Sequence, residues 1–422
     1  MADPFPIRSI TVDEYDLYRR VGEHAFNSAP RSQTRRERVL RQFEPERSLA
    51  AFDTALPADA ALVGTTGVYS LRMTVPGATA PVAGVTAVSV LPSHRRRGVL
   101  RSLMHRQLAD IAARAEEPVA ALWASEAGIY SRYGYGRATS IAYFRFERGE
   151  GAMAAPTPLD PGVRLRLAEP QTVAAELAKV YEAVLPGQPG FFARSEDWWG
   201  RVLHDDPADR HGATPLRCLL AEDTAGVRGY ALYTAAERWN EATGLPDCAL
   251  TVRELLAADP AAGAALWHSL LTRDLVTSVT ADLRSAEDPL LYQLLDPRRA
   301  RAQVADGIWV RIIDLPAALS RRAYSGPVDV VLEVADELLP ANAGRWRLHA
   351  DGGQAGGATC ERTDAAADLA LDVRELGAAY LGGTRLGSLA AAGLVRELRP
   401  GTLTRLSAAM TWDPAPWCPQ IF

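Results

Sequence analysis

A valine-rich run followed by a glycine-bearing turn and a periodic apolar segment constrains the fold of this chain most. Residues 82–90 are largely apolar and β-branched, and Pro92, which cannot donate to a ladder, ends the run. From Leu100 to Arg114 the apolar residues recur at spacings of three and four, which predicts a helix that begins at Gly98. A strand that passes through a tight turn into an amphipathic helix predicts a helix packed on a sheet.

The turn itself has the features of an anion site. Gly98 permits a close turn, so that successive backbone N–H groups and the positive end of the helix point at one place. Three arginines precede it, at positions 95–97. A solvated surface turn and a nucleic-acid patch are the alternatives, but the formal net charge is −5, and no second basic run of this density is present. We therefore favour phosphate binding and expect no nucleic-acid partner.

A second motif follows the helix. Residues 118–124 form a short apolar run, as expected for a strand buried on both faces. Residues 125–136 then predict a brief helix that Ser125 caps and that glycines close. This arrangement would place Tyr130 beside the carboxyl end of a strand.

These residues carry a resemblance to a known family. Arg95 to Val99 resembles the R-x-x-G-x-[GA] turn of the GCN5-related N-acetyltransferases (GNAT), although Leu100 replaces the last small residue. Residues 89–100 and 124–136 together look like the two motifs of the Eis (enhanced intracellular survival) family, and residues 369–383 are similar to a later segment of it. The resemblance extends, more weakly, over nearly the full length.

The resemblance implies a mixed α+β and α/β fold with tandem GNAT-like domains and a sterol-carrier-protein-like domain. We expect a GNAT domain with the acetyl-CoA site at 1–150, a second GNAT-like domain without the CoA motif at 151–300, and the sterol-carrier-like domain at 301–422. The residues agree on the second copy, because its turn at 259–265 contains no basic residue. This domain would either wall the acceptor pocket or merely stabilise the first domain or an oligomer. Segments at 328–334, 345–350 and 369–373 predict an antiparallel sheet in the last domain.

Acetyl-CoA is the cosubstrate that the family implies. The backbone of the strand would hold the pantetheine arm, and the arginine turn would hold the phosphates. The predicted binding residues are Val88, Ser89, Val90, Arg95, Arg96, Arg97, Gly98, Val99 and Ser125.

Two catalytic residues follow from the resemblance. Tyr130 matches the family tyrosine that protonates the departing CoA sulfur, whereas Tyr133 and Tyr135 would fill the core. The C-terminal carboxylate serves as the base in the family, and Phe422 occupies that position. Desolvation would raise the pKa of a buried terminal carboxylate and improve it as a base. From the residues alone, Glu126, His94 or a water chain would be preferred, with the apolar tail at 414–422 only filling a groove.

Composition bounds the remaining properties. The length of 422 residues predicts two or three domains, and no apolar stretch is long enough to span a membrane uninterrupted. The histidines and the four cysteines form no metal-ligand pattern, so we expect no metal and free, buried thiols. The N-terminus lacks an apolar signal segment, which predicts a cytoplasmic location.

The sequence therefore predicts an acetyl-CoA-dependent N-acetyltransferase in which a primary amine attacks the thioester directly. Aminoglycosides and lysine side chains of peptides are the expected acceptors. The alternative is a non-enzymatic lipid or small-ligand carrier that acts through the C-terminal domain. Family resemblance also implies a homohexamer.

Overall fold

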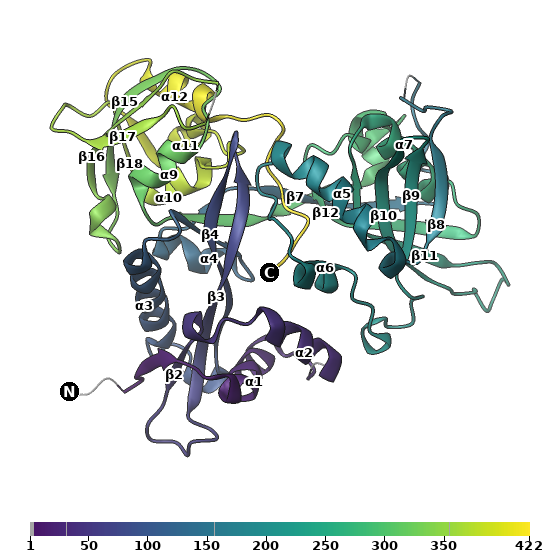
Figure 1. Cartoon of the computed structure of the whole chain (residues 1–422), viewed down its shortest axis with the longest axis horizontal. Helices are drawn as coiled ribbons and strands as arrows, with labels where there is room; N and C mark the ends of the chain where they lie inside the picture. Colours follow the sequence, from purple (N-terminus) through teal and green to yellow (C-terminus); the bar gives the residue numbers. More distant parts are fainter. Residues whose placement is uncertain (1–3, 31, 156, 354) are drawn as a thin grey trace. The chain divides into compact units, whose positions relative to one another are not determined.

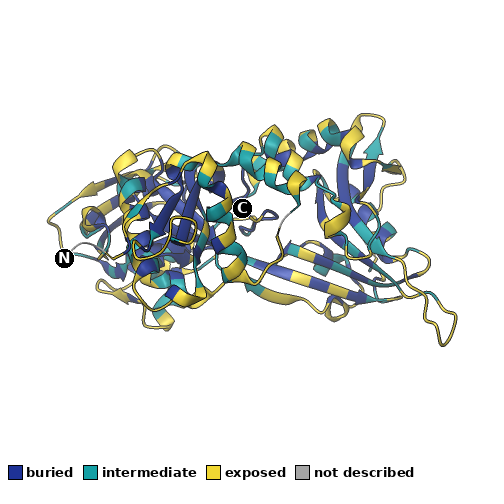
Figure 2. Cartoon of the chain, turned by 90° about the horizontal axis from the view of Figure 1, so that it is seen from below, coloured by how far each residue is buried: buried dark blue, intermediate teal, exposed yellow. Residues whose placement is uncertain are grey.

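The structure, a computed structural model, describes residues 4–30, 32–155, 157–353 and 355–422. The chain divides into two compact units. Unit 1 comprises Met1–Thr139, Gly307–Asp413 and Ile421–Phe422, and unit 2 comprises Ser140–Asp306 and Pro414–Gln420. Buried residues concentrate on the strands, and exposed residues on the outer faces of the helices (Figure 2).

The first sheet of unit 1 contains the predicted strand, and the predicted helix packs on this sheet. The run at 82–90 is the second half of β4, which forms a long hairpin with β3 (Figure 1). β4 also pairs in parallel with β5, the buried strand that the sequence predicted. The strands in sheet order are β1 (Ile7–Ser9), β2 (Leu49–Phe52), β3 (Leu62–Val75), β4 (Ala78–Val90), β5 (Val119–Trp123), β14 (Ile308–Ile312) and β6 (Gly136–Arg137).

Three longer helices accompany this sheet. The predicted helix after Gly98 is confirmed as α3, which buries Leu103, Met104 and Leu108 against the strands. The brief helix α4 follows β5, but its N-cap is Glu126 and not Ser125, and no side chain caps it. The helices are α1 (Tyr15–Phe26), α2 (Gln33–Gln42), α3 (Val99–Arg114) and α4 (Ala127–Tyr130).

Unit 2 contains the second sheet and repeats the strand–helix–strand plan of the first. Here α7 connects the parallel strands β11 and β12, and it ends at Leu271, with Thr272 as its C-cap. The strands in sheet order are β13 (Gln303–Asp306), β7 (Ser140–Glu147), β12 (Val276–Ser285), β11 (Cys248–Ala257), β10 (Gly226–Ala236), β9 (Arg217–Asp223) and β8 (Arg164–Ala168). The helices are α5 (Ala174–Val184), α6 (Glu196–Val202), α7 (Pro260–Leu271) and α8 (Leu290–Gln293).

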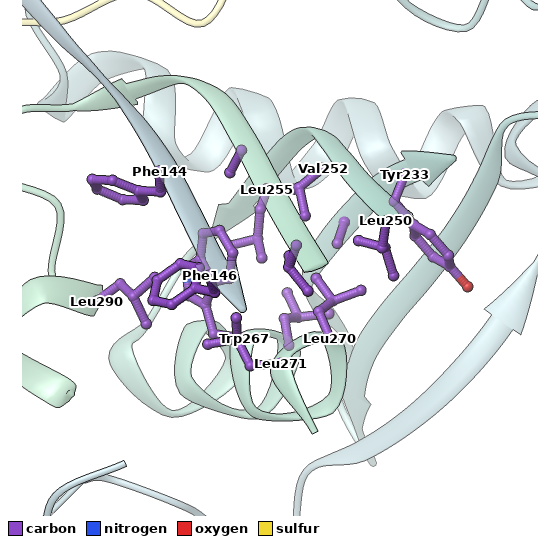
Figure 3. Packing of buried hydrophobic residues seen from close by; sticks show 14 of the residues in the cluster. Phe144, Phe146, Tyr233, Leu250, Val252, Leu255, Trp267, Leu270, Leu271 and Leu290 are labelled. Atoms are coloured by element: carbon purple, nitrogen blue, oxygen red, sulfur yellow. The ribbon is translucent and has the colours of Figure 1, made fainter. Parts of the chain in front are cut away.

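One hydrophobic cluster of unit 2 lies between this sheet and α7, and a second one includes residues of α5 and α6. Phe144 and Phe146 of β7 pack in one cluster with Trp267 and Leu270 of α7 (Figure 3). Strand β7 directly follows the first GNAT-like segment in the sequence, but it pairs in the second sheet and its apolar face packs in the core of unit 2. Conversely, β14 pairs with β5 and β6 in the first sheet. Strand β7 precedes residue 150 but pairs in the second sheet, and β14 follows residue 300 but pairs in the first sheet. The domain boundaries at 150 and 300 stay a prediction.

The third sheet belongs to unit 1 and is mixed, so the prediction of an antiparallel sheet was wrong. The chain crosses over after β17, and β18 consequently runs parallel to β15. The strands in sheet order are β17 (Thr359–Arg362), β16 (Gly344–Ala350), β15 (Val328–Ala335), β18 (Leu369–Asp372) and β19 (Val395–Glu397). The helices are α9 (Leu315–Arg321), α10 (Val373–Ala379), α11 (Leu386–Ala391) and α12 (Thr402–Met410).

Helix α10 packs directly on the first sheet of unit 1. A Cβ atom at Gly377 would collide with the carbonyl oxygen of Val310 in β14, and one at Gly136 in β6 would collide with that of Arg374. Glycine is needed at both positions because backbone approaches backbone. This contact joins the C-terminal block of the chain to the sheet that contains β4 and β5.

Candidate active site

Strands β4 and β5 separate at the centre of the first sheet. Their pairing covers Val82 to Gly84 on β4, whereas β4 continues to Val90. A bulge lies in the separated part, where Ala87 has a φ of 52° and its carbonyl accepts a 2.7 Å hydrogen bond from Thr65 Oγ1. A bulge turns the following residues away from the regular ladder. Residues 88–90 thus have a backbone edge that β5 does not occupy.

The arginine turn connects this separated strand to α3. Arg96 and Gly98 both adopt left-handed backbone conformations, with φ of 62° and 88°. Gly98 is the N-cap of α3, and no side chain caps this end. The first N–H groups of a helix have no partner inside it and carry partial positive charge. The turn therefore presents uncapped donors next to arginine side chains.

A cavity of about 800 Å³ opens beside the separated strand and the turn. This volume is in the range of small-molecule sites. Four arginines and one carboxylate line it, so its electrostatic potential favours an anion. Its lining residues are Ala25, Phe26, Asn27, Val88, Ser89, Val90, His94, Arg95, Arg96, Gly98, Val99, Leu100, Arg101, Ser125, Glu126, Ile129, Tyr130, Arg132 and Tyr133.

Most of the predicted binding residues lie in this one cavity. Ser89 is 5% exposed, and its Oγ has no hydrogen-bond partner in the described part of the chain. A buried hydroxyl without a partner is uncommon and is explained by a ligand or water that completes it. The residues therefore fit a bound molecule with polar groups along β4.

Arg97 is the exception among the predicted binding residues, because it does not line the cavity. Its guanidinium lies 3.7 Å from Asp53 and over the ring of Phe5, with 4.7 Å to the ring centroid. Arg97 follows Arg96, whose φ is positive, so the backbone is not regularly extended at this point of the turn. We do not retain Arg97 in the site.

His94 lines the cavity but is held by other side chains. Its Nε2 lies 3.1 Å from Asp53 Oδ2, and its Nδ1 lies 2.9 Å from Ser93 Oγ. Hydrogen bonds from the backbone of Ala55 and from His94 lower the pKa of Asp53, so this carboxylate stays charged. Both ring nitrogens of His94 are thus occupied, which disfavours it as the base.

Tyr130 ends helix α4 and lines the cavity while being only 5% exposed. Burial, with the nearby Glu126 carboxylate adding to it, raises the pKa of Tyr130 to about 12. Its ring packs edge-on against Tyr135 at a centroid distance of 6.0 Å. The phenol is therefore protonated at neutral pH and can donate a proton.

The other two tyrosines of the motif differ from one another. Tyr135 is fully buried, and burial raises its pKa, which fits the predicted core role. Tyr133 is also buried, but it lines the cavity beside Tyr130 and packs against His105. The interpretation of Tyr133 as a core residue is therefore incomplete.

The last residue of the chain belongs to unit 1. Phe422 is 6% exposed, and a Cβ atom added at Gly84 would lie 3.3 Å from its Cδ2 atom. Gly84 is the last residue of β4 that pairs with β5. The terminal ring thus packs where the two strands begin to separate.

The corresponding helix of unit 2 has its N-terminus occupied by the protein itself. Asp259 is the N-cap of α7, and its carboxylate accepts hydrogen bonds from Ala261 N and Ala262 N at 3.0 Å each. Arg228 donates to the same carboxylate at 2.7 Å. The N-terminal N–H groups of α7 are thus capped by a side chain, whereas those of α3 are not.

Several lining residues were missed by the sequence analysis. The end of α1 contributes Ala25, Phe26 and Asn27, and Arg101 and Arg132 add charge. Nothing in the local pattern of α1 distinguishes its last turn from a surface helix end. Arg101 could have been found, since it lies one turn inside the predicted phosphate-binding helix.

Three family models match the chain. An acetyltransferase (GNAT) domain matches residues 6–138, a second acetyltransferase (GNAT) domain matches 190–312, and a sterol carrier protein domain matches 315–419. The predicted fold class, tandem GNAT-like domains followed by a sterol-carrier-like domain, is confirmed by these matches.

Relatives cover almost the whole chain. An uncharacterized N-acetyltransferase of Streptomyces coelicolor is 43% identical over 98% of this chain and 99% of its own length. The N-acetyltransferase Eis of Mycobacterium tuberculosis is 36% identical over 87% of this chain and 90% of its own. The crystal structure of Eis1 from Mycobacterium abscessus superposes with a TM-score of 0.81 at 33% identity, covering 99% of this chain and all of that one.

Proposed function

The chain belongs to the Eis family of GCN5-related N-acetyltransferases, and from this premise we propose that it transfers acetyl from acetyl-CoA to primary amines. That it is an N-acetyltransferase follows from the matched domains and relatives. The observation that carries the finer proposal is the arginine-lined cavity, which joins the uncapped turn of α3 to Tyr130.

Acetyl-CoA would be held by two kinds of contact. Arg95 and Arg96, with the N–H groups that follow Gly98, would bind the phosphates, because guanidinium groups and helix N-termini both favour oxyanions. The open edge of β4 at residues 88–90 would pair with the amides of the pantetheine arm. Ser125 lines the same cavity and completes the proposed set.

The chemistry needs an acid and a base. The neutral amine nitrogen forms a bond to the thioester carbonyl carbon, the C–S bond breaks, and the departing thiolate takes the proton of the Tyr130 hydroxyl. The proton that the nitrogen sheds as the amide forms restores the Tyr130 phenol. A protonated amine must first lose a proton, which we assign to the terminal carboxylate of Phe422. Support for this assignment is the buried position of Phe422 beside Gly84.

The proposed acceptors are amines of aminoglycosides or lysine side chains of peptides. Several relatives carry the name N-acetyltransferase Eis, which supports an amine acceptor without specifying it. We further propose a homohexamer, which light scattering would test. The proposed cytoplasmic location is supported by the four cysteines, all of which are free thiols, since disulfides are rare in reducing compartments.

The carrier alternative rests on the C-terminal domain, whose described interior contains large buried polar side chains. Arg322 is fully buried and donates to the carbonyl oxygens of Tyr380 at 2.6 Å and Met410 at 2.7 Å. These carbonyls lie at the ends of α10 and α12, where a cation is favourable. An interior held in this way favours a scaffold over a lipid pocket. In the described chain, no helix is long and apolar enough to cross a membrane.

Release of free CoA thiol from acetyl-CoA, measured across aminoglycosides, polyamines and lysine peptides, tests the proposal. We expect turnover with at least one amine class and product mass increased by one acetyl group. Absence of turnover with every amine, together with lipid bound to the purified protein, would favour the carrier.

The terminal base has a separate test. Residues appended after Phe422 should abolish turnover while acetyl-CoA binding stays within about twofold, because the proposed phosphate contacts of Arg95, Arg96 and the start of α3 do not involve the tail. The same residues appended before Met1 are the matched control. Full activity of the C-terminally extended enzyme would refute the assignment of Phe422.

A further inference from the structure

We propose that Arg194 is a positioning residue that holds the C-terminal tail through Gln420 and thereby sets the place of the Phe422 carboxylate. This inference rests on the proposed function of Phe422 as the base. The tail, defined here as residues 414–422, is divided between the two units. Pro414–Gln420 belong to unit 2, whereas Ile421–Phe422 belong to unit 1.

The first part of the tail is bound by the loop after α5. Gln188 Nε2 donates to the carbonyl oxygen of Ala415 at 2.8 Å, and Trp417 N donates to that of Pro189 at 3.2 Å. Gly190 has a φ of 95°, and a Cβ atom there would lie only 2.5 Å from the carbonyl oxygen of Trp417. This loop is thus shaped to let the tail approach its backbone.

Trp417 anchors the tail in the core of unit 2. Its ring is 6% exposed and packs edge-on against Phe191 at a centroid distance of 5.0 Å. The guanidinium carbon of Arg284 lies 5.2 Å from the centroid of the same ring. A buried aromatic side chain with these contacts contributes most to holding such a segment.

Arg194 makes the last side-chain contact of the tail within unit 2. Its Nε donates to Gln420 Oε1 at 2.9 Å. The same guanidinium donates to both carboxylate oxygens of Glu254, at 2.9 and 2.6 Å. An arginine can do this because its donors form a rigid planar fork, so that two bonds to Glu254 also fix the direction of Nε.

The position of Arg194 is itself determined by several buried groups. Tyr230 donates its hydroxyl to Glu254 Oε1 at 2.6 Å. The guanidinium carbon lies 3.9 Å from the ring centroid of Tyr181 and 4.8 Å from that of Trp199. The Arg194 side chain is only 1% exposed and Glu254 only 5%. These contacts make the Nε donor a fixed point in the core.

Arg194 Nε holds Gln420, which precedes the proposed base, Phe422, by two residues. Ile421 follows Gln420, and Phe422 packs against Gly84 of β4. Cys418 adds rigidity, because its buried Sγ lies 3.4 Å from Gln420 N and 3.2 Å from Gln420 O. Pro414, Pro416 and Pro419 restrict the tail backbone further. With the preceding residues held, the terminal carboxylate has little conformational freedom of its own.

The experiment replaces Gln420 by methionine, which keeps the length of the side chain, removes the acceptor and leaves the Arg194–Glu254 pair intact. We expect Gln420→Met to lower kcat by about ten- to a hundredfold, as small misplacements of catalytic groups do. The KM for acetyl-CoA and the melting temperature should stay close to those of the wild type. Gln171→Met is the matched control, since Gln171 makes a side-chain bond to Leu203 O in unit 2 and is not a residue of the tail.

A double-mutant comparison distinguishes positioning from a structural role. In enzyme extended after Phe422, whose residue-422 carboxylate has become a peptide bond, Gln420→Met should have no further effect on the residual kcat, because the group being positioned is gone. A further loss in that background would overturn the inference, as would unchanged kcat in Gln420→Met when the extension alone is harmful. Full activity of the extended enzyme would instead overturn the proposed base, and the inference with it.

Discussion

Arg96 and Arg97 are adjacent in the sequence but have opposite surroundings. Arg96 lines the cavity, while Arg97 lies against Asp53 and Phe5. Arg96→Ala should therefore raise the KM for acetyl-CoA about tenfold, the loss expected for a charged hydrogen bond. Arg97→Ala should leave this KM within about twofold and reduce stability by less than about 1 kcal/mol, because the Arg97 side chain is half exposed. Steady-state kinetics and denaturant unfolding measure both, and equal KM effects would contradict the placement of Arg97.

Tyr130 allows a second prediction at the residue scale. Tyr130→Phe removes the proton donor but keeps the ring and its packing on Tyr135. We expect kcat to fall about a hundredfold with little change in acetyl-CoA affinity, as is typical for loss of a general acid. Because its pKa is raised to about 12, the wild-type enzyme should show no alkaline loss of kcat from this group between pH 7 and 10. A decrease in the kcat of the wild-type enzyme near pH 8 that is absent from Tyr130→Phe would contradict this prediction.

The bulge in β4 is the feature that decides the site at the scale of elements. Ala87 has positive φ, where a β-branched side chain is strained. Ala87→Val should lower the free energy of unfolding by about 1–2 kcal/mol and should also lower kcat, since residues 88–90 follow directly. Ala78→Val at the start of the same strand is the control and should be nearly neutral. Equal stability of the two variants in urea would show that the bulge is not under this constraint.

The whole molecule contains many buried tyrosines, and these predict its response to alkali. Burial raises their pKa above the ordinary value near 10, so the folded state retains protons that the unfolded state loses. Their contribution to stability is therefore complete below about pH 10 and is lost as the pH rises through the folded-state values. The residues concerned include Tyr18, Tyr130, Tyr135, Tyr181, Tyr230, Tyr324 and Tyr380.

We expect the melting temperature to be nearly constant from pH 7 to 9 and to fall steeply between pH 10 and 12. Scanning calorimetry over this range, with tyrosinate absorbance at about 295 nm recorded in parallel, measures both events. Tyrosine ionisation that precedes unfolding, without loss of melting temperature, would contradict the prediction.

Local sequence patterns determined the strand, turn and helix that form the candidate site. The valine run, Gly98 and the spacing of Leu103, Met104 and Leu108 predicted β4 and α3, because strand, turn and helix preferences act over a few residues. The absence of basic residues at 259–265 predicted a second copy without a CoA site, and the structure adds that Asp259 caps the helix end there. The motif at residues 125–136 likewise predicted that Tyr130 follows the buried strand, which is β5.

Tertiary structure alone decided what depends on distant partners. Backbone pairing moved β7 into the second sheet and β14 into the first, and a parallel neighbour changed the sheet of the last domain. Arg97 does not line the cavity, because its guanidinium lies against Asp53 and Phe5. The contact of Arg194 with Gln420 spans more than two hundred positions in the sequence. No local preference encodes such contacts, since they form only when buried surfaces and backbone hydrogen bonds are satisfied together.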